Sequence, residues 1–322
     1  MLEFDLIAYI RNRVRAATGV ALGIGDDAAV LDAVAGEQWV VCTDTLVAGV
    51  HFPHETGAAD IGYKTLAVNL SDLAAMGARP RFATLALTLP GVDVRFVEDL
   101  IEALIALGET HALTLVGGDT TRGPLSLTLT AIGVVPQGRA LRRDTARVGD
   151  GVYVSGTLGD AAAALSLRAQ ATMLDGEARR DFDVLYQRLA RPTPRVALGL
   201  ALRDCARACI DVSDGLSADL AHICAASGVA AAIDPALLPA SAELTRLLPD
   251  SAARLQHQLS GDDYELCFSV DPERESELAA IAATCAVRIS RIGCMIAGSG
   301  VHLRAHDGHL RLSTHQGYQH FA

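Results

Sequence analysis

Strand-like and helix-like apolar patterns alternate along the 322-residue chain. Residues 39–43 and 81–89 have the pattern of buried strands, whereas residues 61–76 carry leucines at the i, i+4, i+7 spacing of a helix face. The alternation pauses once, and the chain is about twice as long as an ordinary domain of roughly 150 residues. We therefore predict a mixed α/β (α+β) protein with two α/β domains, residues 1–140 and 148–322.

Aspartates recur where these predicted strands and helices meet loops, in both halves of the chain. Their neighbours are small or hydroxylated, such as Gly118 and Thr120 beside Asp119, so that carbonyl and hydroxyl oxygens can approach a cation. Carboxylates, carbonyls and water are the ligands that Mg²⁺ prefers. One such aspartate usually forms a turn or caps a helix, but the repetition favours a shared metal site. The aspartates are Asp26, Asp27, Asp44, Asp72, Asp119, Asp211 and Asp214.

The composition excludes several classes of protein. A net charge of −11 argues against nucleic acid and anionic membranes as partners. No apolar run is long enough to span a membrane, and the N-terminus is acidic where a signal peptide is basic. The seven cysteines form no C-x-x-C pair and are expected to be reduced, which favours a cytoplasmic location. Lys64 is the only lysine, so any mechanism that needs a lysine must use it.

Two familiar nucleotide-binding motifs do not fit. Gly23 and Gly25 resemble the start of a dinucleotide fingerprint, but Asp26 and Asp27 stand where the pyrophosphate would lie. The P-loop motif is absent, because Lys64 lies within a predicted helix. If the chain transfers phosphoryl groups, it does so without a P-loop.

Other residues are candidates for contacts with anions. Candidate phosphate clamps are Arg122 and the neighbouring pair Arg142 and Arg143. Each of them could equally be a solvated surface arginine. His51 and Tyr318 are possible substrate contacts, although neither has a motif of its own. These residues acquire specific roles only when the chain is considered as a whole.

Six motifs, taken in order, resemble the thiamine-monophosphate kinase family and cover nearly the whole chain. Gly-Asp-Asp or Ser-Asp-Gly alone would be weak, but the ordered set is specific. The motifs are GDDAA at 25–29, TDTLVAGVHF at 43–52, NLSDLAAMGA at 69–78, GGDTTRG at 117–123, DVSDGL at 211–216 and DYEL at 263–266.

This resemblance implies a fold like that of aminoimidazole ribonucleotide synthetase. Its N-terminal domain forms a homodimer through its sheet, and its C-terminal domain completes the nucleotide and substrate site. The resemblance also implies the last step of thiamine diphosphate biosynthesis, which transfers the γ-phosphoryl group of ATP to thiamine monophosphate with several Mg²⁺ ions. The attacking phosphate oxygen is already anionic, so no general base is required, and metals offset the repulsion between the two anions.

The same resemblance implies roles for individual residues. The catalytic residues are Asp44, Asp72 and Asp119. The metal ligands are Asp27, Thr43, Asp44, Asp72, Asp119, Asp211 and Asp214. The ATP contacts are Gly118, Asp119, Arg143 and Ser213, and the contacts to thiamine monophosphate are His51, Asp262 and Tyr318.

The chain departs from the family pattern at two places. Cys42 stands where the family has Ser or Thr, which puts a side-chain metal contact there in doubt. Ser260 begins a run in which the family has Gly-Gly, and the carboxylate at Asp262 is retained. Neither departure removes one of the implied ligands.

Three other functions remain open at this point. The first is an ATP-dependent synthetase of the same fold with a different phosphorylated substrate. Selenophosphate synthetase is disfavoured, because no Cys or Lys precedes Cys42. The second is a non-catalytic nucleotide or metal sensor, which would bind ATP without forming ADP. The third is a nicotinamide-dependent oxidoreductase, which rests on Gly23 and Gly25 alone.

Overall fold

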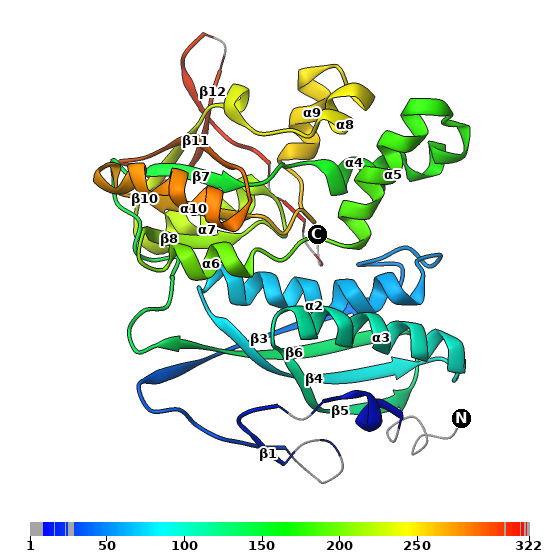
Figure 1. Cartoon of the computed structure of the whole chain (residues 1–322). Coiled ribbons are helices and arrows are strands. Elements are labelled where there is room, and N and C mark those ends of the chain that lie inside the picture. The colour runs from blue at the N-terminus through cyan, green and yellow to red at the C-terminus, as the bar shows by residue number, and fades with distance from the viewer. Residues whose placement is uncertain are drawn as a thin grey trace. The chain divides into compact units, whose positions relative to one another are not determined.

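The structure is a computed structural model, and it describes residues 9–15, 17–22, 24, 29–305, 307–315, 317–318 and 320. The chain divides into two compact units (Figure 1). The first comprises Met1–Leu73 and Ala78–Gly138, and the second comprises Ala74–Gly77 and Arg139–Ala322. No helix in the described ranges is long and apolar enough to cross a membrane.

The first unit contains a four-stranded sheet in the order β3-β6-β4-β5 and a separate β1–β2 pair. β6 is antiparallel to both β3 and β4, whereas β5 runs parallel to β4. The elements are β1 (Val20–Leu22), β2 (Val30–Leu31), β3 (Glu37–Val47), α2 (Ala58–Ala75), β4 (Arg79–Leu89), α3 (Val94–Thr110), β5 (Thr114–Arg122) and β6 (Ser126–Pro136).

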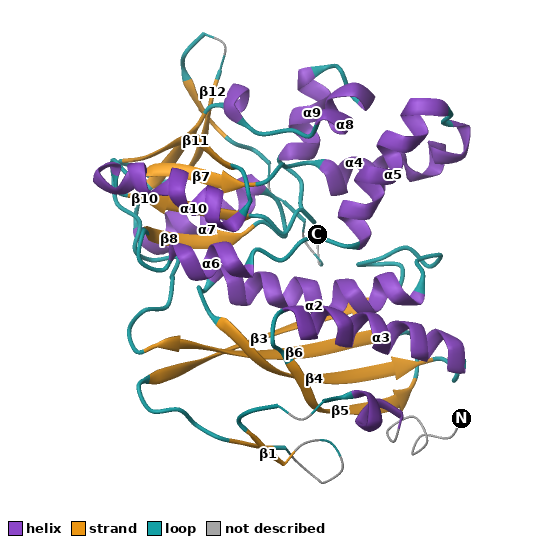
Figure 2. Ribbon diagram, in the orientation of Figure 1, coloured by secondary structure: helices purple, strands orange, loops and turns teal. Residues whose placement is uncertain are grey.

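Helices α2 and α3 lie on the same side of this sheet (Figure 2). Leu66 and Leu70 of α2 are fully buried, as are Leu100 and Ile101 of α3. The opposite side of β3 is exposed, with Trp39 42% and Val41 60% accessible. Because side chains alternate along a strand, β3 has two different faces. We call the side of Trp39 and Val41 the open face and the other the helix-covered face.

The second unit contains a seven-stranded sheet in the order β13-β12-β9-β11-β7-β10-β8. β12 and β9 are parallel, and the other neighbouring strands are antiparallel. The strands are β7 (Gly151–Ser155), β8 (Ala206–Asp211), β9 (Ala230–Ile233), β10 (Leu266–Val270), β11 (Ile289–Ile296), β12 (Gly300–Arg304) and β13 (Leu310–Leu312). The α-helices are α4 (Asp160–Leu167), α5 (Gly176–Ala190), α6 (Val196–Leu202), α7 (Leu216–Ser227), α8 (Ala242–Leu247), α9 (Ser251–Gln258) and α10 (Leu278–Cys285), and the 3₁₀ helices are η1 (Arg168–Met173), η2 (Pro235–Leu237) and η3 (Pro272–Glu277).

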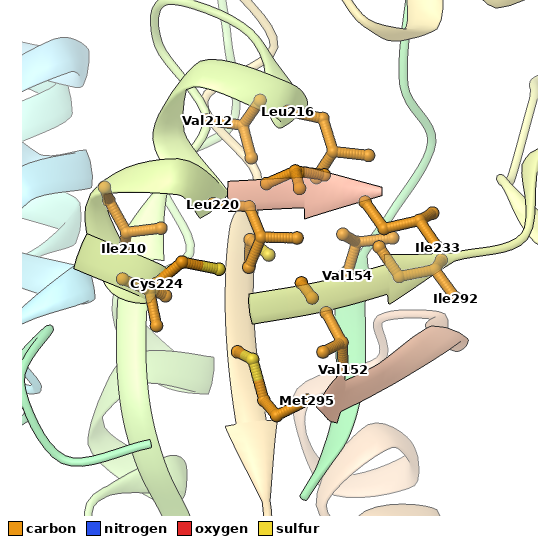
Figure 3. Close-up of a cluster of buried hydrophobic side chains, with 14 of the residues drawn as sticks. Val152, Val154, Ile210, Val212, Leu216, Leu220, Cys224, Ile233, Ile292 and Met295 are labelled. Atoms are coloured by element: carbon orange, nitrogen blue, oxygen red, sulfur yellow. The ribbon is translucent and has the colours of Figure 1, made fainter. Parts of the chain in front are cut away.

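The main core of the second unit lies between α7 and the sheet (Figure 3). Leu220 of α7 packs in one buried cluster with Val152 and Val154 of β7, Ile210 of β8 and Ile292 of β11. These aliphatic side chains are almost completely removed from water, and each contributes about 1.5–3 kcal/mol to folding. The start of α7 is therefore held firmly against the strand end at Asp211.

The fold confirms the predicted mixed α/β class, and local signals placed several elements well. The apolar run at residues 230–233 predicts a strand, which β9 confirms, and α7 begins directly after Gly215 and ends before Gly228. Thr193 and Pro194 predict a helix that runs to about residue 207. The observed helix α6 is shorter, because β8 already begins at Ala206 and pairs with β10.

Two predicted strand ends are wrong. β3 continues past Asp44 to Val47, because it pairs residue by residue with β6 over its whole length. The adjacent glycines at 117 and 118 predict a loop over Gly117–Thr121, but β5 continues to Arg122 along β4. Asp44 and Asp119 thus lie within strands, where alternation decides which face each one occupies.

Candidate functional site

In the first unit, Asp44 and Asp72 lie around one thiol. Cys42 and Asp44 are two residues apart on β3 and share its helix-covered face. The Cys42 sulfur lies 3.5 Å from the Asn69 carbonyl oxygen of α2. Burial, and then the negative charges of Asp72 and Asp44, hold the pKa of Cys42 well above its ordinary value. Strand β3 and helix α2 therefore bring these two carboxylates into one negative region.

Thr43 points to the other side of the strand. Its hydroxyl oxygen lies 2.9 Å from that of Thr130, and Thr45 and Thr128 are paired in the same way at 2.8 Å. Because Thr43 and Asp44 are adjacent, their side chains point to opposite faces. A contribution from Thr43 to a site on the Asp44 side would have to come from its backbone.

Asp119 is also separated from Asp44. The register aligns Thr45 with Thr128, Thr128 with Ala86, and Ala86 with Asp119 across the sheet. Residues aligned in this way share a face, so Asp119 lies on the open face. With three strand spacings between them, Asp44 and Asp119 are roughly 14 Å apart across the sheet. One chain does not bring these two carboxylates together.

Gly118 is needed for the geometry of β5. Its φ is +156°, and a Cβ atom there would lie 2.0 Å from the carbonyl oxygen of Leu85. Any side chain would therefore collide with the backbone of β4. The glycine lets β5 remain paired as it presents Asp119.

His51 is held in a tight turn after β3. The Val47 backbone N–H donates to His51 Nδ1 at 3.0 Å, and the His51 N–H donates to the Val47 carbonyl at 3.0 Å. Lys64, which is only 3% exposed, donates from Nζ to the His51 carbonyl at 3.4 Å. Nδ1 therefore accepts a hydrogen bond within this turn. The only lysine of the chain thus supports a candidate substrate contact.

In the second unit, the loop between β8 and α7 gathers five predicted site residues. Asp211 ends β8, and Ser213 and Asp214 follow it. The Asp262 N–H donates to the Ser213 carbonyl at 2.8 Å, and the Tyr318 N–H donates to the Asp214 carbonyl at 3.1 Å. Residues more than 100 positions apart in the sequence therefore meet at one loop. We call residues 213–215 the SDG loop.

Asp262 has an unfavourable backbone conformation. Its φ is +70°, and Tyr264 has a φ of +50°. Left-handed conformations cost non-glycine residues about 1–2 kcal/mol and often occur at functional sites. Both oxygens of the intervening Asp263 lie 3.0 Å from the Gly159 nitrogen, which donates its N–H to them. The structure thus holds Asp262 against its intrinsic preference.

Asp219 is a residue that the motifs did not single out. It is 3% exposed, and its Oδ2 accepts the backbone N–H groups of Ser213, Asp214 and Gly215 at 3.1, 3.1 and 3.0 Å. Burial, and then the charges of Asp211 and Asp214, raise the pKa of Asp219 to about 7. Its position in the first turn of α7 was the available signal, since acidic residues stabilise helix N-termini.

Arg143 lies in the segment that runs beside β8. Ser227, the last residue of α7, donates its hydroxyl to the Arg143 carbonyl at 2.7 Å. The neighbouring Arg142 is paired with Asp144, with Nε 2.8 Å from Oδ1. No ion pair involves Arg143 among the residues that the structure describes. Of the two adjacent arginines, Arg143 is the better placed to bind an anion.

The remaining predicted ligand, Asp27, lies outside the described residues, as does Asp26. Within the described ranges, no three His, Cys, Asp or Glu side chains form a metal-binding group. Among the described residues, the predicted carboxylate ligands other than Asp119 lie in two acidic groups, one around Cys42 and one around the SDG loop.

Comparison with known proteins identifies the class to which this fold belongs. Residues 25–135 match the sequence profile of the AIR synthase related protein, N-terminal domain, and residues 147–306 match that of the C-terminal domain. The crystal structure of Escherichia coli HypE, a hydrogenase maturation protein, has a TM-score of 0.78 at 21% identity over 98% of this chain and 99% of its own. That likeness concerns the fold alone.

Closer relatives define the family. The thiamine-monophosphate kinase of Escherichia coli is 47% identical over 99% of this chain and 98% of its own length. The crystal structure of thiamine-monophosphate kinase from Stenotrophomonas maltophilia is 51% identical, with a TM-score of 0.88 over 97% of this chain and 98% of its own. The structure of AaThiL complexed with AMPPCP and TMP is 31% identical, with a TM-score of 0.79 over 99% and 97%. The chain belongs to the thiamine-monophosphate kinase family, which confirms the resemblance seen in its motifs.

Proposed function

We propose that the chain transfers the γ-phosphoryl group of ATP to the phosphate of thiamine monophosphate, forming ADP and thiamine diphosphate. The observation that carries this proposal is the 47% identity to a thiamine-monophosphate kinase over 99% of the chain. A further relative, AaThiL, binds AMPPCP, an ATP analogue, together with TMP, and it covers 99% of this chain. Both ligands match the proposed substrates.

The donor atoms of the two acidic groups suit Mg²⁺. Asp44 and Asp72 in the first unit, and Asp211 and Asp214 in the second, offer carboxylate oxygens. Mg²⁺ usually takes only one or two carboxylates and completes its shell with water and phosphate oxygens. Two small groups of carboxylates therefore suit Mg²⁺ coordination better than a site in which the protein supplies every ligand. When bound, Mg²⁺ ions would neutralise the phosphate oxygens of the two substrates.

The other residues position the substrates in this proposal. Arg143 and Ser213 bind ATP, with Gly118 and Asp119 contributing from β5. His51 binds thiamine monophosphate together with Asp262 and Tyr318. The attacking phosphate oxygen is anionic at neutral pH, so the residues act by orientation and charge and none needs to remove a proton.

We further propose that the active form is a homodimer built on the open face of the β3-β6-β4-β5 sheet. Trp39 and Val41 expose apolar surface there. Asp119 lies on that face and is separated from Asp44 within one chain. A catalytic role for Asp119 therefore requires the second chain that packs against this face in the proposed dimer.

The direct test measures ADP and thiamine diphosphate formed from ATP and thiamine monophosphate, with and without Mg²⁺. We expect equal amounts of both products, only with Mg²⁺ present. Free thiamine serves as the control acceptor and should give no product. AMPPCP binding without any thiamine diphosphate formation would point instead to a different acceptor.

Substitution of Asp72 tests the first acidic group. We expect Asp72→Asn to lower kcat by roughly 100-fold, because removing a charged partner costs a few kcal/mol, and to leave the thermal midpoint nearly unchanged. Asp99→Asn, on the exposed side of α3, is the matched control and should keep full activity. Near-normal turnover of Asp72→Asn at limiting Mg²⁺ would contradict the assignment.

A further inference from the structure

Asp219 forms a contact with the SDG loop that the proposed chemistry does not use. Three consecutive backbone N–H groups point at one oxygen of its side chain. Consecutive amides arranged in this way form an anion-binding concavity. Such a concavity often receives a phosphate, but here a buried carboxylate of the chain itself fills it.

The same loop is fixed on its carbonyl side by two other segments. The Ser213 carbonyl accepts the Asp262 N–H, and the Asp214 carbonyl accepts the Tyr318 N–H. The orientation of the loop's peptide planes therefore determines where Ser213 and Asp214 point and where Asp262 and Tyr318 are held. On the amide side, those planes are held by the single Oδ2 atom of Asp219.

Close packing around the SDG loop restricts the rotation of its peptides. Gly261 packs so closely that a Cβ atom there would lie 2.0 Å from the Ser213 carbonyl oxygen. A small rotation of the loop peptides would therefore displace the turn that carries Asp262. Asp219 itself is anchored on α7, where its own N–H donates to the Gly215 carbonyl at 2.9 Å.

We propose that Asp219 is a positioning residue that orients the SDG loop and, through it, Ser213, Asp214, Asp262 and Tyr318. This inference rests on the proposed function for the ligands those residues hold. Asp219 does not contact the substrates in this account. Its carboxylate keeps the three loop amides occupied, so that the loop presents its own side chains to the ligands.

The first test is hydrogen exchange of the ligand-free protein, read from peptides that contain residues 213–215. Buried hydrogen bonds protect amides from exchange, so we expect Asp219→Ala to speed exchange in these peptides at least roughly tenfold. Asp219→Asn keeps an oxygen in place without the charge and should give an intermediate rate. Peptides from β7 should be unchanged in both variants. Equal acceleration throughout the second unit would mean a merely structural role and would overturn the proposal.

The second test measures ligand affinity and kinetics. We expect the Kd of AMPPCP with Mg²⁺, and the KM of thiamine monophosphate, to rise in the order wild type, Asp219→Asn, Asp219→Ala, by roughly tenfold or more for the last. The matched control is Asp181→Asn, a buried carboxylate of the same unit that binds Arg246 and should leave both constants unchanged. Unchanged constants in the Asp219 variants, with faster local exchange, would overturn the proposal.

The two tests also separate this inference from the proposed function. If the wild-type chain formed no thiamine diphosphate, the proposed function would fail. Exchange in the ligand-free protein and AMPPCP binding would still support or overturn the positioning role. Because Asp219→Asn is nearly isosteric, it keeps the test valid if Asp219→Ala does not fold.

Discussion

At the scale of single residues, Asp262 shows most directly how the fold opposes a local preference. Its left-handed backbone is maintained by the hydrogen bond to Ser213, the close contact of Gly261 and the carboxylate of the adjacent Asp263, which accepts the Gly159 N–H. Glu265, 2% exposed, accepts a hydrogen bond from Ser155 and is paired with Arg195. These contacts offset the cost of the strained turn.

Asp262 can be tested with two substitutions that differ in backbone preference. Asp262→Asn tolerates a left-handed conformation and removes only the charge, whereas Asp262→Gly relieves about 1–2 kcal/mol of strain and loses about 0.4–1 kcal/mol to chain entropy. We expect both to raise the KM of thiamine monophosphate roughly tenfold or more, to leave the KM of ATP unchanged, and to keep or raise the thermal midpoint. A midpoint lowered in both variants would show that the carboxylate is structural.

At the scale of elements, α7 connects two groups of candidate ligands. Its first turn carries Asp219 and the SDG loop, and Ser227 at its end holds the Arg143 carbonyl and accepts the Ala146 N–H at 3.0 Å. The packing of Leu220 and Ile223 against the sheet keeps the helix rigid between its ends. Each end therefore holds its own group of candidate ligands in place.

The Ser227 contact predicts a selective effect on ATP. Loss of one hydrogen bond costs about 1 kcal/mol, so Ser227→Ala should raise the KM of ATP by roughly fivefold and leave that of thiamine monophosphate unchanged. Ser166→Ala on α4 removes a comparable hydroxyl that bonds the Ala163 carbonyl, and serves as the control. Equal changes in both KM values would argue against a local role.

The buried thiol of Cys224 on α7 predicts a dependence of stability on pH. Burial raises its pKa from 9.0 to about 11. The folded protein therefore favours the protonated thiol, so this stabilisation is complete below pH 9 and is lost as pH rises through 11. Its size is on the order of 2–3 kcal/mol. In urea unfolding between pH 8 and 11, the free energy of unfolding should fall less steeply for Cys224→Ala than for wild type; parallel slopes would exclude the effect.

At the scale of the whole molecule, the open face of the first sheet leads to a prediction about assembly. We expect the wild type to be a dimer by light scattering at micromolar concentration. Val41→Glu should give monomers, because a charge would be buried in the interface, and activity should fall with it. Val184→Glu changes a similarly exposed valine on α5 and should remain dimeric. A monomeric wild type with full activity would refute the proposed dimer.

Much of the fold followed from local patterns. The apolar periodicities identified the α/β class, and Ser213, Asp214 and Gly215 marked the start of α7 because such residues end strands and begin helices. The ordered motifs identified the family. The predicted strand ends were wrong where pairing between distant strands outweighed local signals, as at Asp44 in β3 and at Gly117–Thr121 in β5.

The sequence by itself determined the family, the fold class and the types of residue available for the chemistry, because these depend on residue identity and short-range spacing. Only the tertiary structure decided that Asp44 and Asp119 occupy opposite faces of one sheet. Side chains alternate with a period of two, so a face is set by the register with β6 and β4. Likewise, Asp262 and Tyr318 meet at the SDG loop through backbone hydrogen bonds between distant segments, and no local pattern specifies such bonds.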